Sequence, residues 1–362
     1  MLINIVSILA LFSIVILVHE FGHFWVAKRS GIRVETFSLG FGPKIFSWRR
    51  GETVYQVCFL LFGGFVKMSG EDYDDKKEFD PREYMGKPPG IRALVVASGA
   101  IHNLLLGFLL LIPAFMIGVI DYDGTRIGSF VKEMPAERAG IRVGDEIVSI
   151  NGMPCRSWLG WFDVTQNIKA ATAADRKAPI VVVVKRGPEI RSFTVVPRPL
   201  EVTNLSGKKE TAFVIGILPT EMVARYGPAG AVRRASVEFV RINYGIYVAF
   251  KMLFTRQISA KLLSGPVGIA KWGAEIAHLG IAEFMRYLAL ISINLGIVNL
   301  FPIPFLDGGH LVGLLGERVT RIRPKKRLLE IVQYVGVIAL LMLAFYVTYN
   351  DIIRILEEQI KK

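Results

Sequence analysis

The chain has 362 residues, 52% of them hydrophobic, and a mean hydropathy of +0.43. This is too apolar for a soluble protein of two or three domains and predicts a membrane protein with an inserted soluble module. The net charge is +13, but the basic residues form no stripe with interleaved aromatic residues, so we expect no nucleic-acid partner. Basic residues instead flank apolar segments, as cytoplasmic loops of membrane proteins do.

The first predicted span runs from about Ile3 to Ala27, and its only ionisable side chains are His19, Glu20 and His23. Residues four apart share one face of a helix, so the two histidines can bind one metal ion with Glu20 beside them. Two histidines that bond to neighbouring helices are the structural alternative. Ionisable side chains are costly inside an apolar span, which favours the metal site. The N-terminus lacks a basic region and a cleavage site, so we predict no cleavable signal peptide.

Residues 34–70 carry seven glycines or prolines between short β-branched and aromatic runs, which predicts a β-hairpin region rather than a helix. Arg49 to Glu52 are typical of its turn. We expect this sheet to approach the metal, where an exposed strand edge near Gly64 can pair with an extended substrate. An ordinary cytoplasmic loop is the alternative. Residues 71–90 are charged and proline-containing, and predict a solvated linker.

The second span is predicted over residues 93–120 and completes an N-terminal membrane half, residues 1–120. It contains the polar patch Ser98-Gly-Ala-Ile-His-Asn103. Asn103 is a candidate for orienting substrate or supporting the metal site. Small residues and an asparagine are equally common where transmembrane helices pack. We interpret His102 as a packing residue.

Residues 121–200 have the composition of a soluble α+β domain, with short strands, tight turns and a helix predicted over 160–174. The sequence from Pro135-Ala136 through Ala139-Gly140-Ile141 to Gly144-Asp145 resembles a PDZ domain. The resemblance implies a groove for an extended peptide. A bulky cap that limits access to the membrane site is the alternative. Cys58 and Cys155 fall on opposite sides of the predicted membrane, which excludes a disulfide between them.

Residues 201–282 are predicted as a linker followed by an amphipathic helix over 228–254, which lies at the membrane interface. Residues 283–362 form a C-terminal membrane half. Its first span, from about Phe284 to Leu300, is broken by two prolines, and the break presents Asn299 and Asp307. The loop that follows is strongly basic, which predicts that it lies on the cytoplasmic side of the membrane. The last span covers residues 328–349.

Four spans with the N-terminus outside place His19 and Asp307 at similar depth, on the cytoplasmic side of the midplane. Asp307 can therefore supply the third ligand of a catalytic zinc, which keeps an open position for water. Glu20 would take a proton from that water and pass it to the leaving amine. We expect Asn299 to bind substrate backbone or a developing oxyanion. A structural role for Asn299 at the broken helix is the alternative.

Several segments together resemble a site-2 protease, an intramembrane zinc metalloprotease, of the regulator-of-sigma-E branch. They are His19-Glu20-Phe21-Gly22-His23, Gly63-Gly64-Phe65-Val66-Lys67-Met68, Ser264-Gly265-Pro266 and Asn299-Leu-Phe-Pro-Ile-Pro-Phe-Leu-Asp307-Gly308. The resemblance implies Zn²⁺-dependent cleavage of transmembrane segments in regulated intramembrane proteolysis. The implied substrates are membrane-anchored anti-sigma factors or remnant signal peptides. Two departures from the family are Gly99-Ala100 in place of Gly-Pro, and room for one PDZ domain rather than two.

The resulting fold class is an α-helical polytopic membrane protein with about four transmembrane helices, a membrane-associated β-hairpin and an inserted α+β PDZ-like domain. We expect it in the bacterial inner membrane, embedded in the lipid bilayer, with both termini and the PDZ-like domain outside. Two alternatives remain. One is a non-catalytic adaptor whose PDZ-like domain binds envelope proteins. The other is a metal transporter, against which the small number of spans and the lack of an internal repeat argue.

Overall fold

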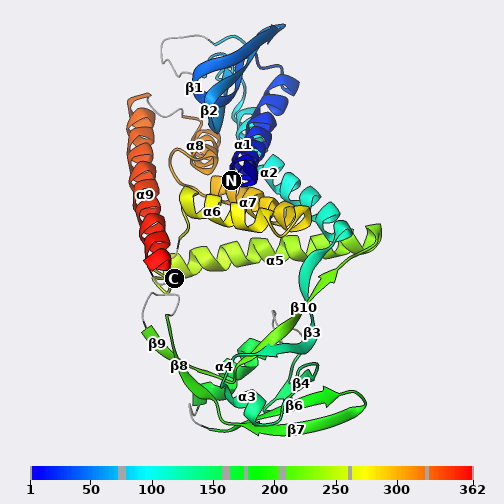
Figure 1. Ribbon diagram of the computed structural model, residues 1–362. Helices are drawn as coiled ribbons and strands as arrows, with labels where there is room; N and C mark the ends of the chain where they lie inside the picture. Colours follow the sequence, from blue (N-terminus) through cyan, green and yellow to red (C-terminus); the bar gives the residue numbers. More distant parts are fainter. Residues whose placement is uncertain are drawn as a thin grey trace. The chain divides into compact units, whose positions relative to one another are not determined.

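The computed structural model describes residues 2–71, 79–156, 164–174, 178–203, 209–259, 263–322 and 326–360 (Figure 1). The chain folds into two compact units. The membrane unit comprises Met1–Ile117, Tyr226–Met252 and Leu263–Lys362. The inserted unit comprises Gly118–Arg225 and Leu253–Leu262. The inserted unit therefore interrupts the membrane unit in sequence, as the composition predicts.

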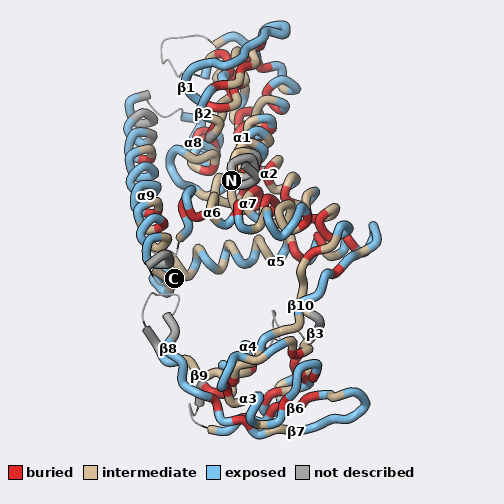
Figure 2. Tube along the Cα trace, in the orientation of Figure 1, coloured by how far each residue is buried: buried red, intermediate tan, exposed pale blue. Residues whose placement is uncertain are grey.

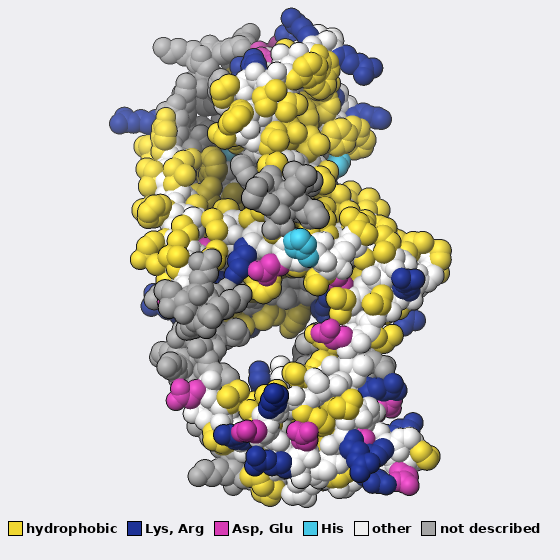
Figure 3. Space-filling view, viewed as in Figure 1, with side chains coloured by type: hydrophobic (Ala, Val, Ile, Leu, Met, Phe, Trp, Pro, Cys, Tyr) yellow, Lys and Arg dark blue, Asp and Glu magenta, His cyan; other side chains and the backbone are white. Residues whose placement is uncertain are grey.

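The membrane unit is built mainly from helices, namely α1 (Leu2–Arg29), α2 (Pro89–Ile117), α5 (Pro228–Phe254), α6 (Pro266–Ala277), α7 (Ile281–Leu300), α8 (Asp307–Thr320) and α9 (Lys326–Ile360). Within the described residues, four stretches are long and apolar enough to cross a membrane: Leu11–Arg29, Pro89–Ile117, Ile281–Leu300 and Tyr334–Glu357. Hydrophobic side chains cover much of this unit's surface (Figure 3). The predicted polytopic membrane class is therefore confirmed. The last stretch extends beyond the predicted 328–349, because α9 continues to Ile360.

Helix α5 is amphipathic and is not one of these four stretches. It runs across the direction of α9 within the membrane unit (Figure 1). Buried residues of the unit lie along α1 and α2 (Figure 2), in clusters that these helices form with their neighbours. Leu11 and Val15 of α1 pack with Leu288 of α7 in one such cluster. These contacts hold the middle of α1 in place, and His19 follows one turn later.

The hairpin is formed by β1 (Val34–Arg50) and β2 (Thr53–Met68), which pair antiparallel across a turn at Gly51 and Glu52. Strand β1 bends, because it passes through Gly40 and Gly42 with positive φ. Residues 36–39 consequently pair with 54–57 on one side and with 64–67 on the other. The segment 64–68 is thus an edge of this small sheet.

Residues 79–90 do not form the solvated linker that their charge predicts. Tyr84 is 8% exposed and packs in a cluster with Val26 of α1, Val66 of β2 and Leu314 of α8. The backbone N–H of Tyr84 donates to Ser69 O at 2.8 Å. This segment therefore joins the base of the hairpin to the helices. Residues 72–78 of the predicted linker lie outside the described part of the chain.

The inserted unit has a sheet with strand order β10-β3-β4-β6-β7, in which β5 pairs with β4. The strands are β3 (Val119–Phe130), β4 (Glu146–Ile150), β5 (Met153–Pro154), β6 (Ile180–Arg186), β7 (Glu189–Val195) and β10 (Ile217–Ala224). A separate pair consists of β8 (Arg198–Thr203) and β9 (Lys209–Val214), and the helices are α3 (Pro135–Arg138) and α4 (Val164–Ala174).

The predicted end of this domain at residue 200 is too early. Strand β10 pairs antiparallel with β3, with Ile217 opposite Phe130, so the unit continues to Arg225. The predicted linker over 201–282 accordingly begins with strands of the inserted unit. The core contains Ile127, Ile180 and Ile215, with Ile168 of α4 packed against it. The first residues of the helix predicted over 160–174 lie outside the described residues.

Candidate metal centre

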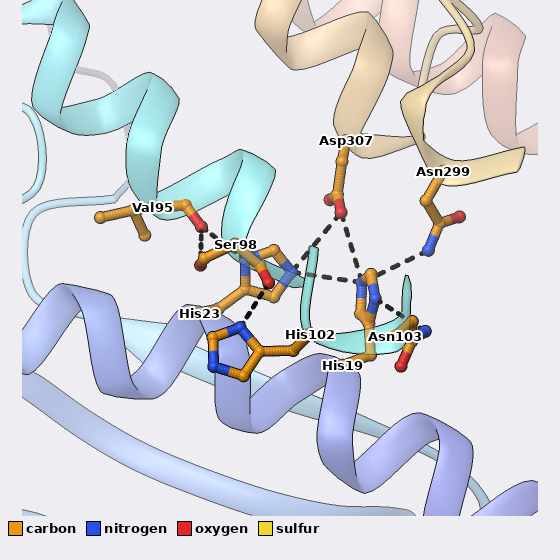
Figure 4. A network of polar contacts seen from close by, with 8 residues as sticks. All are labelled: His19, His23, Val95, Ser98, His102, Asn103, Asn299 and Asp307. Carbon is orange, nitrogen blue, oxygen red and sulfur yellow. Dashed lines mark hydrogen bonds and ion pairs between the residues drawn. The ribbon is translucent and has the colours of Figure 1, made fainter. Parts of the chain in front are cut away.

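Three side chains from the two ends of the sequence converge within the membrane unit (Figure 4). His19 and His23 project from one face of α1, and their Nε2 atoms are 3.2 Å apart. Oδ2 of Asp307, the first residue of α8, lies 3.3 Å from Nε2 of His19 and 3.6 Å from Nε2 of His23. These residues form a group able to hold a metal ion. The helical spacing of the histidines explains the first contact, and the helix break at Pro302 and Pro304 makes room for Asp307 to enter.

The triangle fits a zinc ion. Nitrogen and oxygen ligands at about 2.0–2.1 Å from zinc in tetrahedral geometry are about 3.3 Å from one another. The three observed separations of 3.2, 3.3 and 3.6 Å match this value. Oδ2 of Asp307 is buried and forms no hydrogen bond with the described residues. A buried carboxylate oxygen between two imidazole nitrogens is costly unless a cation satisfies it, so the donor set and its geometry suit zinc.

Glu20 lies beside this triangle and next to the hairpin. The backbone of Val66 in β2 is within hydrogen-bond reach of its carboxyl group. A Cβ on Gly64 would come within 3.0 Å of Cγ of Glu20 and 2.9 Å of Ser38 O. Gly64 therefore allows the edge of the sheet to approach α1 at the position of Glu20.

A pocket of about 240 Å³ opens next to the three candidate ligands. The residues that line it come from α1, the hairpin, α7, the α7–α8 loop and the start of α8: Ile16, His19, Glu20, Phe41, Gly63, Gly64, Leu295, Asn299, Phe305, Leu306 and Asp307. Polar side chains of His19, Glu20, Asn299 and Asp307 thus line the pocket together with apolar ones. This arrangement can hold a peptide bond close to a metal and a carboxylate.

Asn299 reaches the site from the last turn of α7. Its Nδ2 lies 3.3 Å from Nε2 of His19, and its side chain lines the pocket. After α7 ends at Leu300, the chain turns through Phe305, whose φ is +78°, before α8 begins at Asp307. This turn places Asn299 and Asp307 on the same side of His19. His310, one turn further along α8, does not belong to the metal-holding group.

Helix α2 supports the site from the other side. A Cβ on Gly99 would lie 2.4 Å from Nε2 of His23, so only glycine permits this approach of α2 to the histidines. One turn later, the amide of Asn103 lies 3.3 Å from Nδ1 of His19 and is completely buried. His102 faces away, with Nδ1 2.8 Å from Ser98 O and its ring against Trp25. This role of Gly99 was not predicted from the sequence. The small residues of this segment are the sequence feature that could have indicated it.

The sequence profile of peptidase family M50 matches residues 7–343. The regulator of sigma-W protease RasP of Bacillus subtilis is 29% identical, covering 97% of this chain and 99% of that protein. The zinc metalloprotease RasP of Geobacillus kaustophilus is also 29% identical, covering 96% of this chain and 97% of that one. A chain of Clostridium acetobutylicum named as a candidate zinc metalloprotease is 32% identical, covering 97% of both. The similarity therefore extends over both ends of the sequence that meet at the site.

Proposed function

The chain belongs to peptidase family M50 and is a zinc metalloprotease of the membrane, and from this premise we propose that it cleaves the transmembrane segments of membrane-anchored proteins. The observation that carries the proposal is the triangle of His19, His23 and Asp307, with Glu20 at its side and a pocket in front. Anti-sigma factors and remnant signal peptides are substrates of the right kind. The relative that is named a regulator of sigma-W protease supports the former.

In this proposal, His19, His23 and Asp307 hold the zinc and Glu20 moves the protons. Zinc, when bound, supplies Lewis-acid chemistry that makes a water molecule acidic and polarises the scissile carbonyl. Glu20 accepts the proton of the attacking water and donates it to the leaving amine. Asn299 donates a hydrogen bond from Nδ2 to the substrate carbonyl or its developing negative charge.

The edge of the hairpin supplies a place for an extended substrate. Val66 points its backbone toward Glu20, and Met68 donates its N–H to Glu71 at 3.2 Å, so neither N–H points into the sheet. Alternate residues of a strand face the same edge. Gly64 therefore presents its backbone on this edge too, beside the pocket. We propose that a transmembrane segment unwinds here and pairs with Gly64, which brings a peptide bond to the metal.

We further propose that both termini and the inserted unit lie outside the cytoplasmic membrane of a bacterium, with the site toward the cytoplasm. Lys28 and Arg29 end α1, and the segment between α8 and α9 is strongly basic. Loops rich in lysine and arginine stay on the cytoplasmic side.

For the inserted unit we propose a PDZ-like role in substrate selection. Strand β10 is an edge of the sheet, and α4 packs with Ile215 and Ile217 around the same core. An edge strand can pair with an extended peptide. A size filter is the alternative. Cleavage of substrates that differ only in a bulky outer domain, or only in the exposed peptide end, distinguishes these two roles.

The test combines metal content with cleavage. We expect about one zinc per purified chain, and cleavage of a membrane-anchored model peptide. Asp307→Ala is expected to lose the zinc and the cleavage together, because two histidines alone hold it weakly. Glu20→Gln is expected to keep the zinc and to lose about 10²- to 10⁴-fold in rate, the typical contribution of a general base.

Two results contradict the proposal. Full zinc content in Asp307→Ala removes this residue from the metal site. Normal cleavage by Glu20→Gln removes the carboxylate from the reaction. If the wild-type chain binds no zinc yet still captures membrane-anchored proteins, the non-catalytic adaptor is the better description.

A further inference from the structure

The two candidate histidine ligands differ in the hydrogen-bond partner of Nδ1, the ring nitrogen that faces away from the metal site. Both present Nε2 to the metal site. A neutral imidazole that offers its lone pair at Nε2 carries its proton on Nδ1, and this proton needs an acceptor. Nδ1 of His23 donates to the backbone O of Val95 at 2.9 Å. Nδ1 of His19 instead faces the side-chain amide of Asn103 at 3.3 Å (Figure 4).

The amide of Asn103 satisfies this requirement in only one of its two orientations. With Nδ2 toward His19, two donors would face each other, and Oδ1 has no partner among the described residues although it is buried. A buried amide oxygen without a hydrogen bond is costly. Rotation of the amide by 180° places Oδ1 against Nδ1–H of His19. The same rotation removes the clash of donors and satisfies the oxygen.

The surroundings of Asn103 fix the position of its side chain. Its exposed fraction is 0%, and Ser292 of α7 donates from Oγ to its backbone O at 2.7 Å. Gly99, one turn earlier, lets α2 lie directly against the two histidines. The residues that line the pocket come from other elements than α2. Asn103 therefore lies behind His19, away from the space that a substrate can enter.

We propose that Asn103 is a positioning residue for zinc: its Oδ1 accepts the Nδ1 proton of His19 and so directs the Nε2 lone pair at the metal. The proposal rests on the zinc site described above, and of the two roles predicted for Asn103, orienting substrate or supporting the metal site, it selects the second. Acceptors behind metal-binding histidines fix both the tautomer and the ring orientation, and their loss typically costs 10- to 100-fold in metal affinity.

The experiment measures zinc affinity of the full-length protein in detergent by competition with a chelator. Visible absorption of the Co²⁺-substituted protein reports the coordination geometry. Asn103→Leu keeps a similar volume and removes the acceptor, so we expect zinc affinity at least tenfold weaker and an altered Co²⁺ spectrum. Asn103→Asp keeps acceptors and removes the amide donors. We expect it to bind zinc more tightly, because a carboxylate raises the basicity of the histidine.

Ser292→Ala is the matched control. It removes the buried hydrogen bond from α7 to the backbone O of Asn103 without touching the contact to His19, so we expect lower thermal stability and unchanged zinc affinity. Less than a tenfold loss in folded Asn103→Leu overturns the proposal. If that variant does not fold, Asn103→Asp decides alone, and unchanged or weaker zinc binding overturns it. Failure of the wild-type chain to bind zinc contradicts the proposed function instead, which keeps the two failures distinct.

Discussion

At the scale of single residues, Gly64 links the hairpin to the chemistry. Its Cα lies so close to α1 that an added Cβ would meet Cγ of Glu20 and the backbone O of Ser38. We expect Gly64→Ala to lower the cleavage rate by about tenfold, since a misplacement of about 1 Å near reacting groups has large effects. Zinc content should stay unchanged, because the ligands lie elsewhere.

Gly63→Ala is the control for this prediction. The three atoms nearest a Cβ on Gly63 all belong to the ring of Phe41, which is 47% exposed, so a surface side chain and not the backbone would have to move. We expect near-normal cleavage by this variant. Equal rates for the two variants would mean that the close approach at Gly64 has no role in positioning Glu20.

The residues of the metal site differ in how far the sequence could predict them. The spacing of His19 and His23 is local, so a helix alone brings them together. Asp307 is far away in sequence, and only the count of spans and the charge of the loops placed it at the same depth. The contact between Asn103 and His19 depends on how α2 is rotated about its axis. A single sequence of small and apolar residues does not determine that rotation, so the sequence left open whether Asn103 orients substrate or supports the metal site.

At the scale of elements, a buried ion pair holds α8 in place. Arg92 near the start of α2 is 2% exposed and binds Glu317 of α8 through Nη2, and its Nε donates to Lys87 O at 3.0 Å. Glu317→Leu leaves this guanidinium without its carboxylate. Breaking a buried pair typically costs about 3–5 kcal/mol. We expect a lower unfolding temperature and weaker zinc binding, because α8 carries Asp307.

A double-mutant cycle tests whether the pair itself is responsible. Arg92→Met combined with Glu317→Leu replaces both charges by apolar groups, so it should be more stable than Glu317→Leu alone. Additive losses of stability in the two single variants would show that the residues act independently. In that case Leu314 and its apolar neighbours hold α8 without help from the ion pair.

A second ion pair makes the inserted unit sensitive to acid. Burial alone would raise the pKa of Asp145, but two hydrogen bonds from Arg186 and one from the backbone N–H of Arg142 outweigh it and lower the pKa below its usual value. A carboxyl group with a lowered pKa stabilises the fold above its unfolded pKa of about 4. This stabilisation is lost as the pH falls through the lowered folded value.

We therefore expect the thermal stability of the inserted unit to fall below about pH 4, and to fall less steeply in Asp145→Asn. Glu146→Gln is the control, since Glu146 pairs with Arg126 at a solvent-exposed position where such pairs contribute little. Equal acid sensitivity of wild type and Asp145→Asn would assign the effect to other carboxyl groups.

The C-terminal boundary of the inserted unit could not be predicted from local sequence patterns. The turns from Pro135 to Gly152 and the β-branched strands at 180–195 predicted most of the sheet. Strand β10 joins it by pairing with β3, which lies about 90 residues earlier. Nothing in the local sequence of β10 distinguishes this pairing from a strand in a linker. Residues 79–90 are a similar case, because their contacts are with the hairpin and α8.

At the scale of the whole molecule, the proposed topology predicts which loops face the cytoplasm. Helix α2 separates the hairpin from the inserted unit in sequence, and it is long and apolar enough to cross the membrane. Gly51 at the hairpin turn and Gly187 between β6 and β7 therefore belong on opposite sides. Both have open space around them, so a cysteine there is accessible to a reagent; because both have a φ of 61°, each substitution costs about 1–2 kcal/mol of backbone strain. The native Cys58 and Cys155 are both buried and give a low background.

We expect a membrane-impermeant thiol reagent to label Gly187→Cys in intact spheroplasts, and to label Gly51→Cys only after the membrane is permeabilised. Cleavage by each variant confirms that the labelled protein is folded. Labelling of Gly51→Cys in intact cells would place the hairpin outside and reverse the orientation. The basic segment around Arg318 and Arg321 would then face outward, against the charge bias that sets membrane topology. Labelling of both positions in intact cells would mean that α2 does not cross the bilayer.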